Sequence, residues 1–201
     1  METVTRRELA INAVQQIAFR HGIGATAPTT IKDSNNAIVD LGTTNLVAKV
    51  ATSTLPSRLI DTEFIVLAHL HHKNAPTGRL SDNIDHGPHD ALGCRLFFVE
   101  RLQVIDTEVA ASTALDAVLA THDALADLAL PVPYSATTLT VARTLLDDPT
   151  RTAALPEQER TFCLAVGSRL REELDALTWE AQVLHGDPWI GGNLVNTNNG
   201  L

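Results

Sequence analysis

The first hundred residues alternate between helical and strand-like spacing of their apolar positions. Residues 8–20 place apolar side chains every three to four positions and end just before Gly22, which predicts a short helix closed by a glycine. Two runs rich in Val, Ile and Leu follow at residues 37–41 and 46–50, and the residues between them are Gly-Thr-Thr-Asn. Such runs joined by turn-forming residues predict a β-hairpin.

A second helix and a further strand complete this part. Residues 58–71 carry a mainly apolar face that repeats every three to four positions, which predicts a helix. After a polar loop at residues 74–92, the run Arg-Leu-Phe-Phe-Val-Glu at residues 95–100 follows Gly93 and is typical of a buried strand. We therefore expect a β-rich first part in which the helix at residues 58–71 lies between the strands.

From residue 103 onward the pattern is mainly helical. One helix is expected to end at Pro131 and another to begin at Pro156, where a helix tolerates proline and its dipole favours the acidic residue that follows. The first helix is expected to have one amphipathic face, made of Leu115, Val118, Leu119, His122, Leu125 and Leu128, with His122 at the margin of a helix interface. The second carries an apolar stripe of Phe162, Val166, Leu170, Leu174 and Leu177. The pattern as a whole predicts an α+β fold.

The composition indicates a globular chain and argues against two classes of partner. With 201 residues, 44% hydrophobic and 19% charged, the chain can bury a substantial core. Its formal net charge of −9 argues against general binding to nucleic acid. The apolar run at residues 64–70 is too short to cross a bilayer, and the first residues lack the apolar core of a signal peptide. We expect a cytoplasmic protein with no membrane partner.

Cysteine and histidine positions favour no metal site. Cys94 and Cys163 lie far apart in different kinds of segment, so we expect two buried thiols rather than a disulfide framework or a Cys-rich zinc site. His69, His71 and His72 cluster at the end of a predicted helix, but no carboxylate or Cys has a matching spacing. A solvated last helical turn is the favoured interpretation of that cluster.

The residues best suited to chemistry lie in a Gly-rich segment near the C-terminus. Residues 184–195 read Leu-His-Gly-Asp-Pro-Trp-Ile-Gly-Gly-Asn-Leu-Val and contain Asp187 and Asn193. In phosphoryl transfer an Asp accepts the proton of the substrate hydroxyl, and an Asn amide oxygen binds Mg²⁺. Taken alone, His-Gly-Asp is a common polar turn, and Lys49 and Glu63 would be a surface lysine and a solvent-facing glutamate. A tight, Gly-rich loop that carries this Asp and this Asn can nevertheless perform phosphoryl transfer.

The chain resembles the aminoglycoside phosphotransferase and choline kinase-like family over essentially its whole length. His-Gly-Asp at residues 185–187, followed by Asn193, is similar to the catalytic loop of that family. The run Val-Ala-Lys-Val at residues 47–50 resembles the strand that carries its phosphate-binding lysine, and residues 32–39 resemble the turn that covers the phosphates. The segments 85–89 and 97–100 are similar to a loop and to the strand that leads into the hinge. The resemblance implies a protein-kinase-like fold with two lobes.

The resemblance also implies an activity and roles for individual residues. Members are kinases that use ATP and Mg²⁺ to phosphorylate a hydroxyl of a small molecule. Lys49 would hold the α- and β-phosphates, and Glu63 would orient its ammonium. Asp187 would accept or position the substrate hydroxyl, and Asn193 would ligate Mg²⁺. Further nucleotide contacts would come from Ser34 and Asn35 at the phosphates and from the backbone near Val99 and Glu100 at the adenine.

Two departures from the family pattern shape what we expect of the chain as written. Five residues separate Asp187 from Asn193 where the family usually has four, and the family's Asp-Phe-Asp/Glu segment, with a further Mg²⁺-binding Asp, would come after Leu201. We therefore expect a complete β-rich nucleotide-binding lobe at residues 1–102, an incomplete helical lobe at residues 103–201, and impaired catalysis. A non-catalytic nucleotide-binding module and an inactive truncated gene product remain the alternatives.

Overall fold

The structure of the chain is a computed structural model that describes residues 5–24, 26–34, 36–51, 58–81, 84–130, 136–178, 182–186, 188, 193–198 and 200. Within these residues the chain forms a five-stranded antiparallel sheet and five helices. The α+β class expected from the sequence is confirmed. The chain divides into two compact units, residues 1–128 with 183–201 and residues 129–182. The functional division at residue 102 and the two-lobed kinase arrangement stay predictions.

The first unit is built on a sheet with the strand order β1-β2-β3-β5-β4. The strands are β1 (Thr29–Asp33), β2 (Ala37–Asp40), β3 (Leu46–Ala51), β4 (His89–Ala91) and β5 (Cys94–Glu100). The expected hairpin is β2 and β3, and β3 also pairs with β5 along its whole length. The central strand β3 and its two neighbours, β2 and β5, are thus the strands that the pattern of apolar residues predicted.

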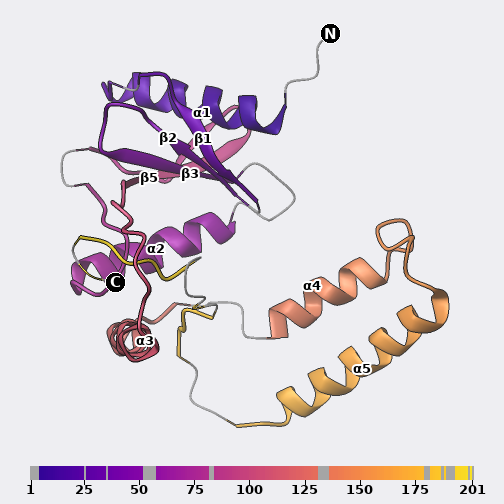
Figure 1. Ribbon diagram of the computed structural model, residues 1–201. Helices are drawn as coiled ribbons and strands as arrows, with labels where there is room; N and C mark the ends of the chain where they lie inside the picture. The colour runs from indigo at the N-terminus through magenta and orange to yellow at the C-terminus, as the bar shows by residue number, and fades with distance from the viewer. Residues whose placement is uncertain are drawn as a thin grey trace. The chain divides into compact units, whose positions relative to one another are not determined.

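Helix α1 (Arg6–Arg20) covers one face of this sheet (Figure 1). Because side chains alternate between the faces of a strand, every second strand residue points toward this helix. The resulting core joins small and β-branched residues of α1 to the sheet, and it comprises Ala10, Ala13, Val14, Ile17, Ala18, Ala37, Val39, Leu41, Leu46, Ala48, Val50, Ala91, Cys94, Leu96 and Phe98. The strand residues that alternate with these core residues therefore point to the face of the sheet opposite α1.

Both ends of α1 are closed by local hydrogen bonds. Thr5 and Glu8 form a capping box, in which the Thr5 N–H donates to the Glu8 carboxylate at 2.7 Å and the Glu8 N–H donates to the Thr5 hydroxyl at 3.3 Å. At the other end Gly22 has a φ of 67°, and the N–H of Ile23 donates to the carbonyl of Ala18 at 2.8 Å. This pairing is the Schellman closure of a helix, and it confirms the predicted stop at the glycine.

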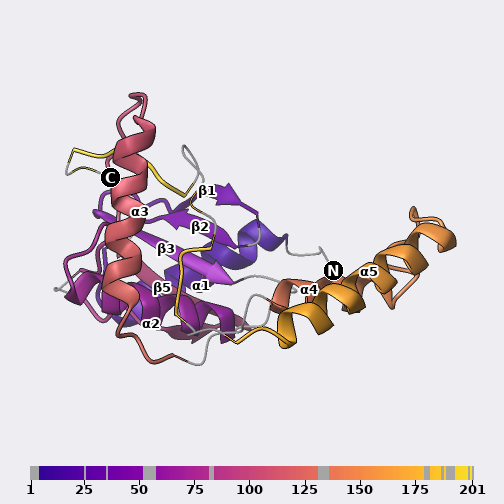
Figure 2. The same cartoon turned by 90° about the horizontal axis from the view of Figure 1, so that it is seen from below.

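Helices α2 (Arg58–His72) and α3 (Ala111–Leu125) lie on the opposite side of the sheet from α1 (Figures 1 and 2). The predicted buried face of α3 is wrong in part, because Leu115 and Leu119 are 57% and 51% exposed. Of the predicted face Leu125 is buried, and the other buried residues of the helix are Ala114, Ala117 and Thr121. Small side chains let a helix axis approach its neighbours closely, so the first part of α3 packs through its small residues and leaves Leu115 and Leu119 outward, while Leu125 is buried at the end of the helix.

A charged cluster joins the ends of α2 and α3. The Lys73 ammonium lies 2.5 Å from one carboxylate oxygen of Asp127, and His69 Nε2 lies 3.1 Å from the other. The hydrogen bond from Lys73, together with the positive charges of Lys73 and His69, holds the pKa of Asp127 below its usual range. The stabilisation from this carboxylate is therefore complete above its unfolded pKa of about 3.9 and is lost as the pH falls through the lower folded value.

We expect Asp127→Asn to reduce the acid sensitivity of the first unit. At neutral pH the variant should be slightly less stable than the wild type, because the amide carries no charge to pair with Lys73. The difference should vanish as the pH falls below the folded pKa of Asp127, because the wild-type carboxyl is then neutral as well. Urea midpoints measured between pH 2 and 7 check this, with Asp116→Asn on the exposed side of α3 as the control. A difference that is independent of pH would contradict the assignment.

The second unit is a helical hairpin of α4 (Ala136–Leu146) and α5 (Glu157–Asp175). The predicted start of α5 after Pro156 is confirmed, whereas α4 was not predicted. A cavity of about 650 Å³ lies between the two helices and is lined by apolar residues of both, including Phe162, Val166 and Leu170 of the predicted stripe. Cys163 is exposed here, so the expectation of two buried thiols holds only for Cys94.

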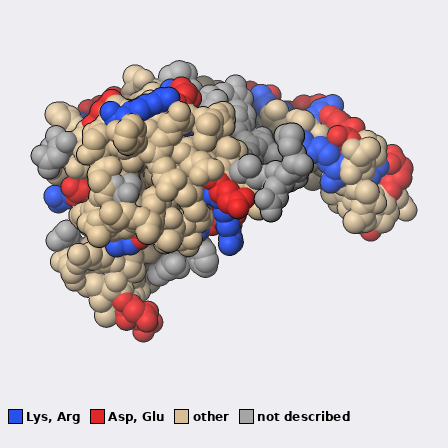
Figure 3. Space-filling view, turned by 90° about the horizontal axis from the view of Figure 1, so that it is seen from above, with Lys and Arg blue, Asp and Glu red and all other residues tan. Residues whose placement is uncertain are grey.

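The surface shows no segregation of charge on the face drawn in Figure 3. Lys and Arg side chains are interspersed with Asp and Glu side chains there, and most of that face belongs to other residues. Among the helices that the structure describes, none has both the length and the apolar composition needed to cross a bilayer.

Candidate functional site

An ion pair between Lys49 and Glu63 connects the sheet to α2. The ammonium of Lys49 on β3 donates to Glu63 Oε1. The strand register places Lys49 between Ile38 of β2 and Phe97 of β5, so its aliphatic stem has apolar neighbours on both sides. Of the two side chains, 25% and 42% are exposed, respectively. The pair is therefore partly shielded from water and still accessible to a ligand.

The packing of α2 places Glu63 opposite the lysine. The ring of Phe64 lies 5.5 Å from the ring of Phe97, measured between centroids, which holds the helix against β5. Arg95 Nε of β5 donates to Asp61 Oδ1 at 2.7 Å, so a second ion pair joins the same two elements. These contacts are made by residues on either side of Glu63 in the sequence. The position of Glu63 is therefore set by the packing of the helix and not by the ion pair alone.

The turn between β1 and β2 lies at the same end of the sheet as Lys49. Ala37, the first residue of β2, pairs with Val50, and Ile38 pairs with Lys49. The turn is closed by the N–H of Ser34, which donates to the carbonyl of Asn36 at 3.1 Å. Asn35, the other residue expected to contact phosphates, lies outside the described residues. Ser34 is thus only a few residues along the ladder from the lysine that it was expected to assist.

The end of β5 borders a polar cavity of about 560 Å³. The cavity is lined by Glu100 and by four further parts of the chain: the turn before β3, the loop after α2, the residues after β5 and a C-terminal segment. The residues are Asn45, Asn74, Ala75, Pro76, Thr77, Gly78, Arg79, Arg101, Leu102, Gln103, Asn193, Leu194, Val195, Thr197 and Asn198. The N–H of Glu100 donates to the carbonyl of Arg79 at 2.8 Å. The predicted adenine contact near Val99 and Glu100 therefore does not use this N–H as the structure stands.

The predicted catalytic Asp187 lies outside the described residues, but the residues before it are placed. The N–H of His185 donates to Nε2 of His122 on α3 at 3.3 Å. Gly186 has a φ of 79°, in the left-handed region that favours glycine. The entrance to the predicted catalytic loop is thus anchored on α3 and turns at a glycine.

The segment after Asn193 is held against the chain that follows β5. Thr197 forms an isolated antiparallel bridge with Val104, and the carbonyl of Asn196 accepts from the N–H of Ile105 at 2.8 Å. Thr197 and Gly200 exchange two backbone hydrogen bonds of 2.9 and 3.0 Å. These contacts hold the segment beside the chain that follows β5, and Asn193 lines the cavity beside Glu100.

The structure gathers the predicted site residues at two places. Lys49 and Glu63 meet between β3 and α2, whereas Asn193 and Glu100 share the polar cavity. Neither member of the ion pair lines that cavity. On β3, Lys49 is separated by three ladder positions from Leu46, the partner of Glu100, which is about 10 Å at the usual rise of a strand.

Two arginines of the cavity were not anticipated from the sequence. Arg79 follows α2 in an irregular segment, and Arg101 directly follows β5. Arg101 also forms an ion pair with Asp40, a carboxylate that is buried at the end of β2. Neither arginine belongs to a periodic pattern or a motif. The only available signal was a cation placed directly after the strand that was expected to lead to the nucleotide.

Comparisons of this chain with models of known protein families, with curated proteins and with solved structures find no match. They therefore assign no family to it. The resemblance based on the motifs stays a hypothesis, and its support has to come from the geometry of the first unit.

Proposed function

We propose that this chain is an ATP-dependent phosphotransferase that transfers the γ-phosphate to a hydroxyl of a small molecule. The observation that carries the proposal is the ion pair between Lys49 of β3 and Glu63 of α2. In protein kinases a lysine of the third strand binds the phosphates and pairs with a glutamate of the helix that follows. The present pair joins the same two kinds of element in the same order along the chain.

The strand register supports a nucleotide that lies along the sheet. Lys49 and the turn at Ser34 mark one end of β3, and Glu100 lies opposite the other end. The separation of about 10 Å along the strand leaves room for a ribose between a base near Glu100 and phosphates near Lys49. The cavity of about 560 Å³ beside Glu100 lies within the range of small-molecule sites, about 300–1,000 Å³.

In this proposal the chain acts mainly by positioning and by neutralising charge. Lys49 binds the phosphates and is oriented by Glu63, while Asp187 accepts the proton of the substrate hydroxyl. The amide oxygen of Asn193 suits Mg²⁺, a cation that prefers oxygen ligands. Bound Mg²⁺ would supply neutralisation of the charge that develops on the transferred phosphoryl group. No covalent intermediate on the protein is required.

The proposal is tested by measuring binding and transfer separately on the full chain. Calorimetric titration with Mg-ATP measures binding, and release of ADP is then followed with a panel of alcohols, amino alcohols and sugars as acceptors. We expect saturable binding, and ADP release that increases with at least one acceptor. Asp187→Asn should abolish that increase and leave binding intact, because the amide cannot accept the proton. Asp116→Asn is the control for the loss of one negative charge.

The possible results separate the proposal from its alternatives. Binding without acceptor-dependent ADP release in any member of the panel would favour the non-catalytic nucleotide-binding module. A folded chain that shows no heat of binding at millimolar Mg-ATP would overturn both interpretations. An Asp187→Asn variant with wild-type transfer would remove Asp187 from the mechanism.

A further inference from the structure

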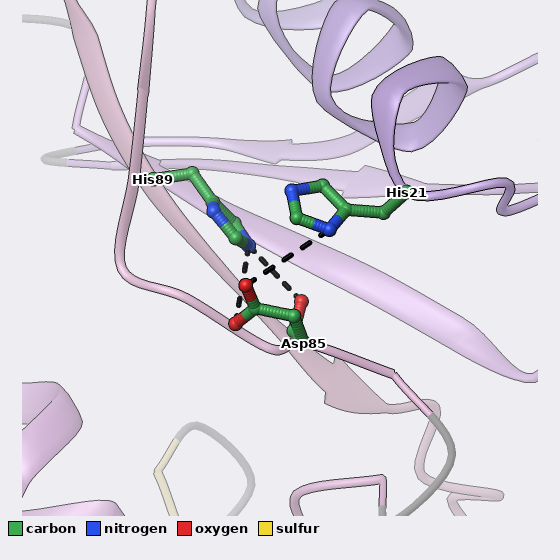
Figure 4. A group of neighbouring side chains, drawn as sticks. All are labelled: His21, Asp85 and His89. Carbon is green, nitrogen blue, oxygen red and sulfur yellow. Dashed lines mark hydrogen bonds and ion pairs between the residues drawn. The ribbon is translucent and has the colours of Figure 1, made fainter.

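A group of three potential metal ligands lies at the C-terminal end of α1, on the side of the sheet that α1 covers. It consists of His21, Asp85 and His89, and one ligand atom of each lies within 4.8 Å of the others (Figure 4). We propose that these three side chains bind a divalent transition-metal ion, with Zn²⁺ as the reference ion. The proposal does not depend on the proposed kinase activity, because none of the three residues has a role in it.

The distances in the group are close to those of a coordination shell. His21 Nδ1 lies 3.9 Å from Asp85 Oδ2, and His89 Nε2 lies 3.9 Å from the other oxygen, Oδ1. With one ligand atom taken from each residue, all three atoms lie within 4.8 Å of one another. Zinc binds histidine nitrogen at about 2.0–2.1 Å and carboxylate oxygen at about 2.0–2.2 Å, so ligand atoms of a tetrahedral site lie about 3.4 Å apart. The two measured separations thus exceed the separation in a tetrahedral site by about 0.5 Å. They are also too long for direct hydrogen bonds between the imidazoles and the carboxylate, so the carboxylate is not already bonded to either ring.

Each ligand is carried by a backbone that local interactions already fix. His21 is the cap residue of α1, and its own N–H donates to the carbonyl of Ile17 at 3.1 Å. Asp85 Oδ1 accepts from the N–H of Gly87 at 3.1 Å, which orients the carboxylate. His89 is the first residue of β4 and pairs with Leu96, a core residue on the α1 face. Three separate segments therefore converge without any of them depending on the ion.

Gly87 is required for the loop to wrap closely around His89. Its φ is 103°, and a Cβ at this position would lie 2.9 Å from Cδ2 of the His89 ring and 3.0 Å from the His89 nitrogen. A side chain at residue 87 would therefore push the loop away from the imidazole. The glycine keeps the carboxylate of Asp85 within reach of both histidines.

The two imidazoles are arranged as neighbouring ligands and not as a stacked pair. Their ring centroids are 4.5 Å apart, and the planes are tilted by 43°. His89 Nε2 currently makes a 3.0 Å hydrogen bond to the carbonyl of Asp85, which the ion would replace with a stronger bond to the neutral imidazole nitrogen. The His89 side chain is only 10% exposed, whereas that of Asp85 is 62% exposed. The site is therefore open to solvent on the side of the carboxylate and closed on the side of His89.

The donor set selects the class of metal. Two imidazoles with one carboxylate suit Zn²⁺ and neighbouring transition metals, whereas Mg²⁺ and Ca²⁺ prefer shells made of oxygen. Three protein ligands leave a fourth position for water or another small ligand. An ion can reach the site from solvent, because the Asp85 side chain is 62% exposed.

The test measures binding of Zn²⁺ alone to the metal-free full chain, in the absence of nucleotide. We expect one Zn²⁺ per chain by equilibrium dialysis, a rise in the thermal midpoint on adding Zn²⁺, and the visible absorption of tetrahedral Co²⁺ when cobalt replaces zinc. His21→Ala and Asp85→Asn should each weaken the affinity by about tenfold or more, by analogy with the 10–100-fold effects of residues that support metal ligands. The matched control is the double variant His71→Ala/His72→Ala at the end of α2.

The side chains of His21 and Asp85 are both partly exposed, so their replacement should not disturb the core. Loss of metal binding can therefore be separated from loss of the fold. Metal-free melting temperatures of the two variants should match that of the wild type. Binding that survives in both His21→Ala and Asp85→Asn, or that is lost only in the His71/His72 variant, would overturn the assignment. So would the absence of stoichiometric binding in the wild type. Failure of Mg-ATP binding would leave this result untouched, because the two experiments share no ligand.

Discussion

Replacing Lys49 by Met is expected to weaken binding of Mg-ATP by about 10- to 150-fold, which corresponds to the roughly 1.5–3 kcal/mol of a hydrogen bond to a charged group. Met keeps the apolar stem that lies between Ile38 and Phe97, so the sheet should remain intact. Glu63 loses its partner but is 42% exposed and can be hydrated. Calorimetric titration with Mg-ATP measures the effect, and circular dichroism verifies the fold.

The chain offers a matched control in Lys73. This lysine also pairs with a carboxylate, that of Asp127 at 2.5 Å. It lies directly after the C-terminal end of α2, whereas Lys49 lies on β3. Lys73→Met removes the same charge and should leave the affinity for Mg-ATP within about twofold, because surface pairs of this kind have small effects. Glu63→Gln should cause a smaller loss than Lys49→Met, since the amide still accepts a hydrogen bond. Equal affinities for Lys49→Met and wild type would exclude Lys49 from the nucleotide site.

The parts of the fold that the sequence predicts are those whose apolar residues are periodic. Residues 46–50 form a compact apolar run broken only by Lys49, and they form the centre of the sheet. β1 was not predicted because all but one of its five residues are exposed and its pattern lacks an apolar side. β4 has only three residues, too few to show a period. Strand formation at these edges is determined by pairing with β2 and β5 and not by local preference.

The face that a helix buries was harder to predict than its position. In α3 the large residues Leu115 and Leu119 suggest one face, but the structure buries Ala114 and Ala117. A hydrophobic pattern records side-chain size and polarity, whereas burial also depends on how closely the neighbouring elements approach. Helix α4 was not predicted for a related reason, because its Ala-Thr-Thr beginning has little apolar signal.

The candidate site shows the same division between what is local and what is not. Pairing of Lys49 with Glu63 was expected from the resemblance, and the structure contains the pair, although its role stays a prediction. His21 is separated from Asp85 and His89 by more than sixty positions, so no spacing rule connects them. They meet because α1 packs against β4, so that the residue at the end of the helix lies beside the start of the strand. Such groups become visible only when the topology is known.

Gly42→Ala is expected to destabilise the first unit by about 2–5 kcal/mol, which combines the cost of a left-handed alanine with that of forcing extra volume into a packed site. Gly42 has a φ of 77°, and a Cβ there would lie 1.9 Å from the carbonyl oxygen of Thr26. Neither group can easily move away. The Gly42 N–H is bonded to Asp40 Oδ1 at 3.0 Å, and Thr26 is fixed by a 2.9 Å hydrogen bond between its hydroxyl and that of Thr43.

Gly93→Ala separates the two causes of this loss. Gly93 has nearly the same φ, 76°, but a Cβ there would meet no atom within 4 Å. The variant should therefore show only the cost of the backbone conformation, about 1–2 kcal/mol. Urea unfolding followed by circular dichroism gives both values, and amide hydrogen exchange in β2 and β3 shows whether the loss is local to the hairpin. If the two variants were equally stable, the collision with Thr26 would not exist, and the turn between β2 and β3 would have to lie farther from residue 26. A loss that is larger by at least about 1 kcal/mol for Gly42→Ala would instead show that the hairpin end is packed against that segment.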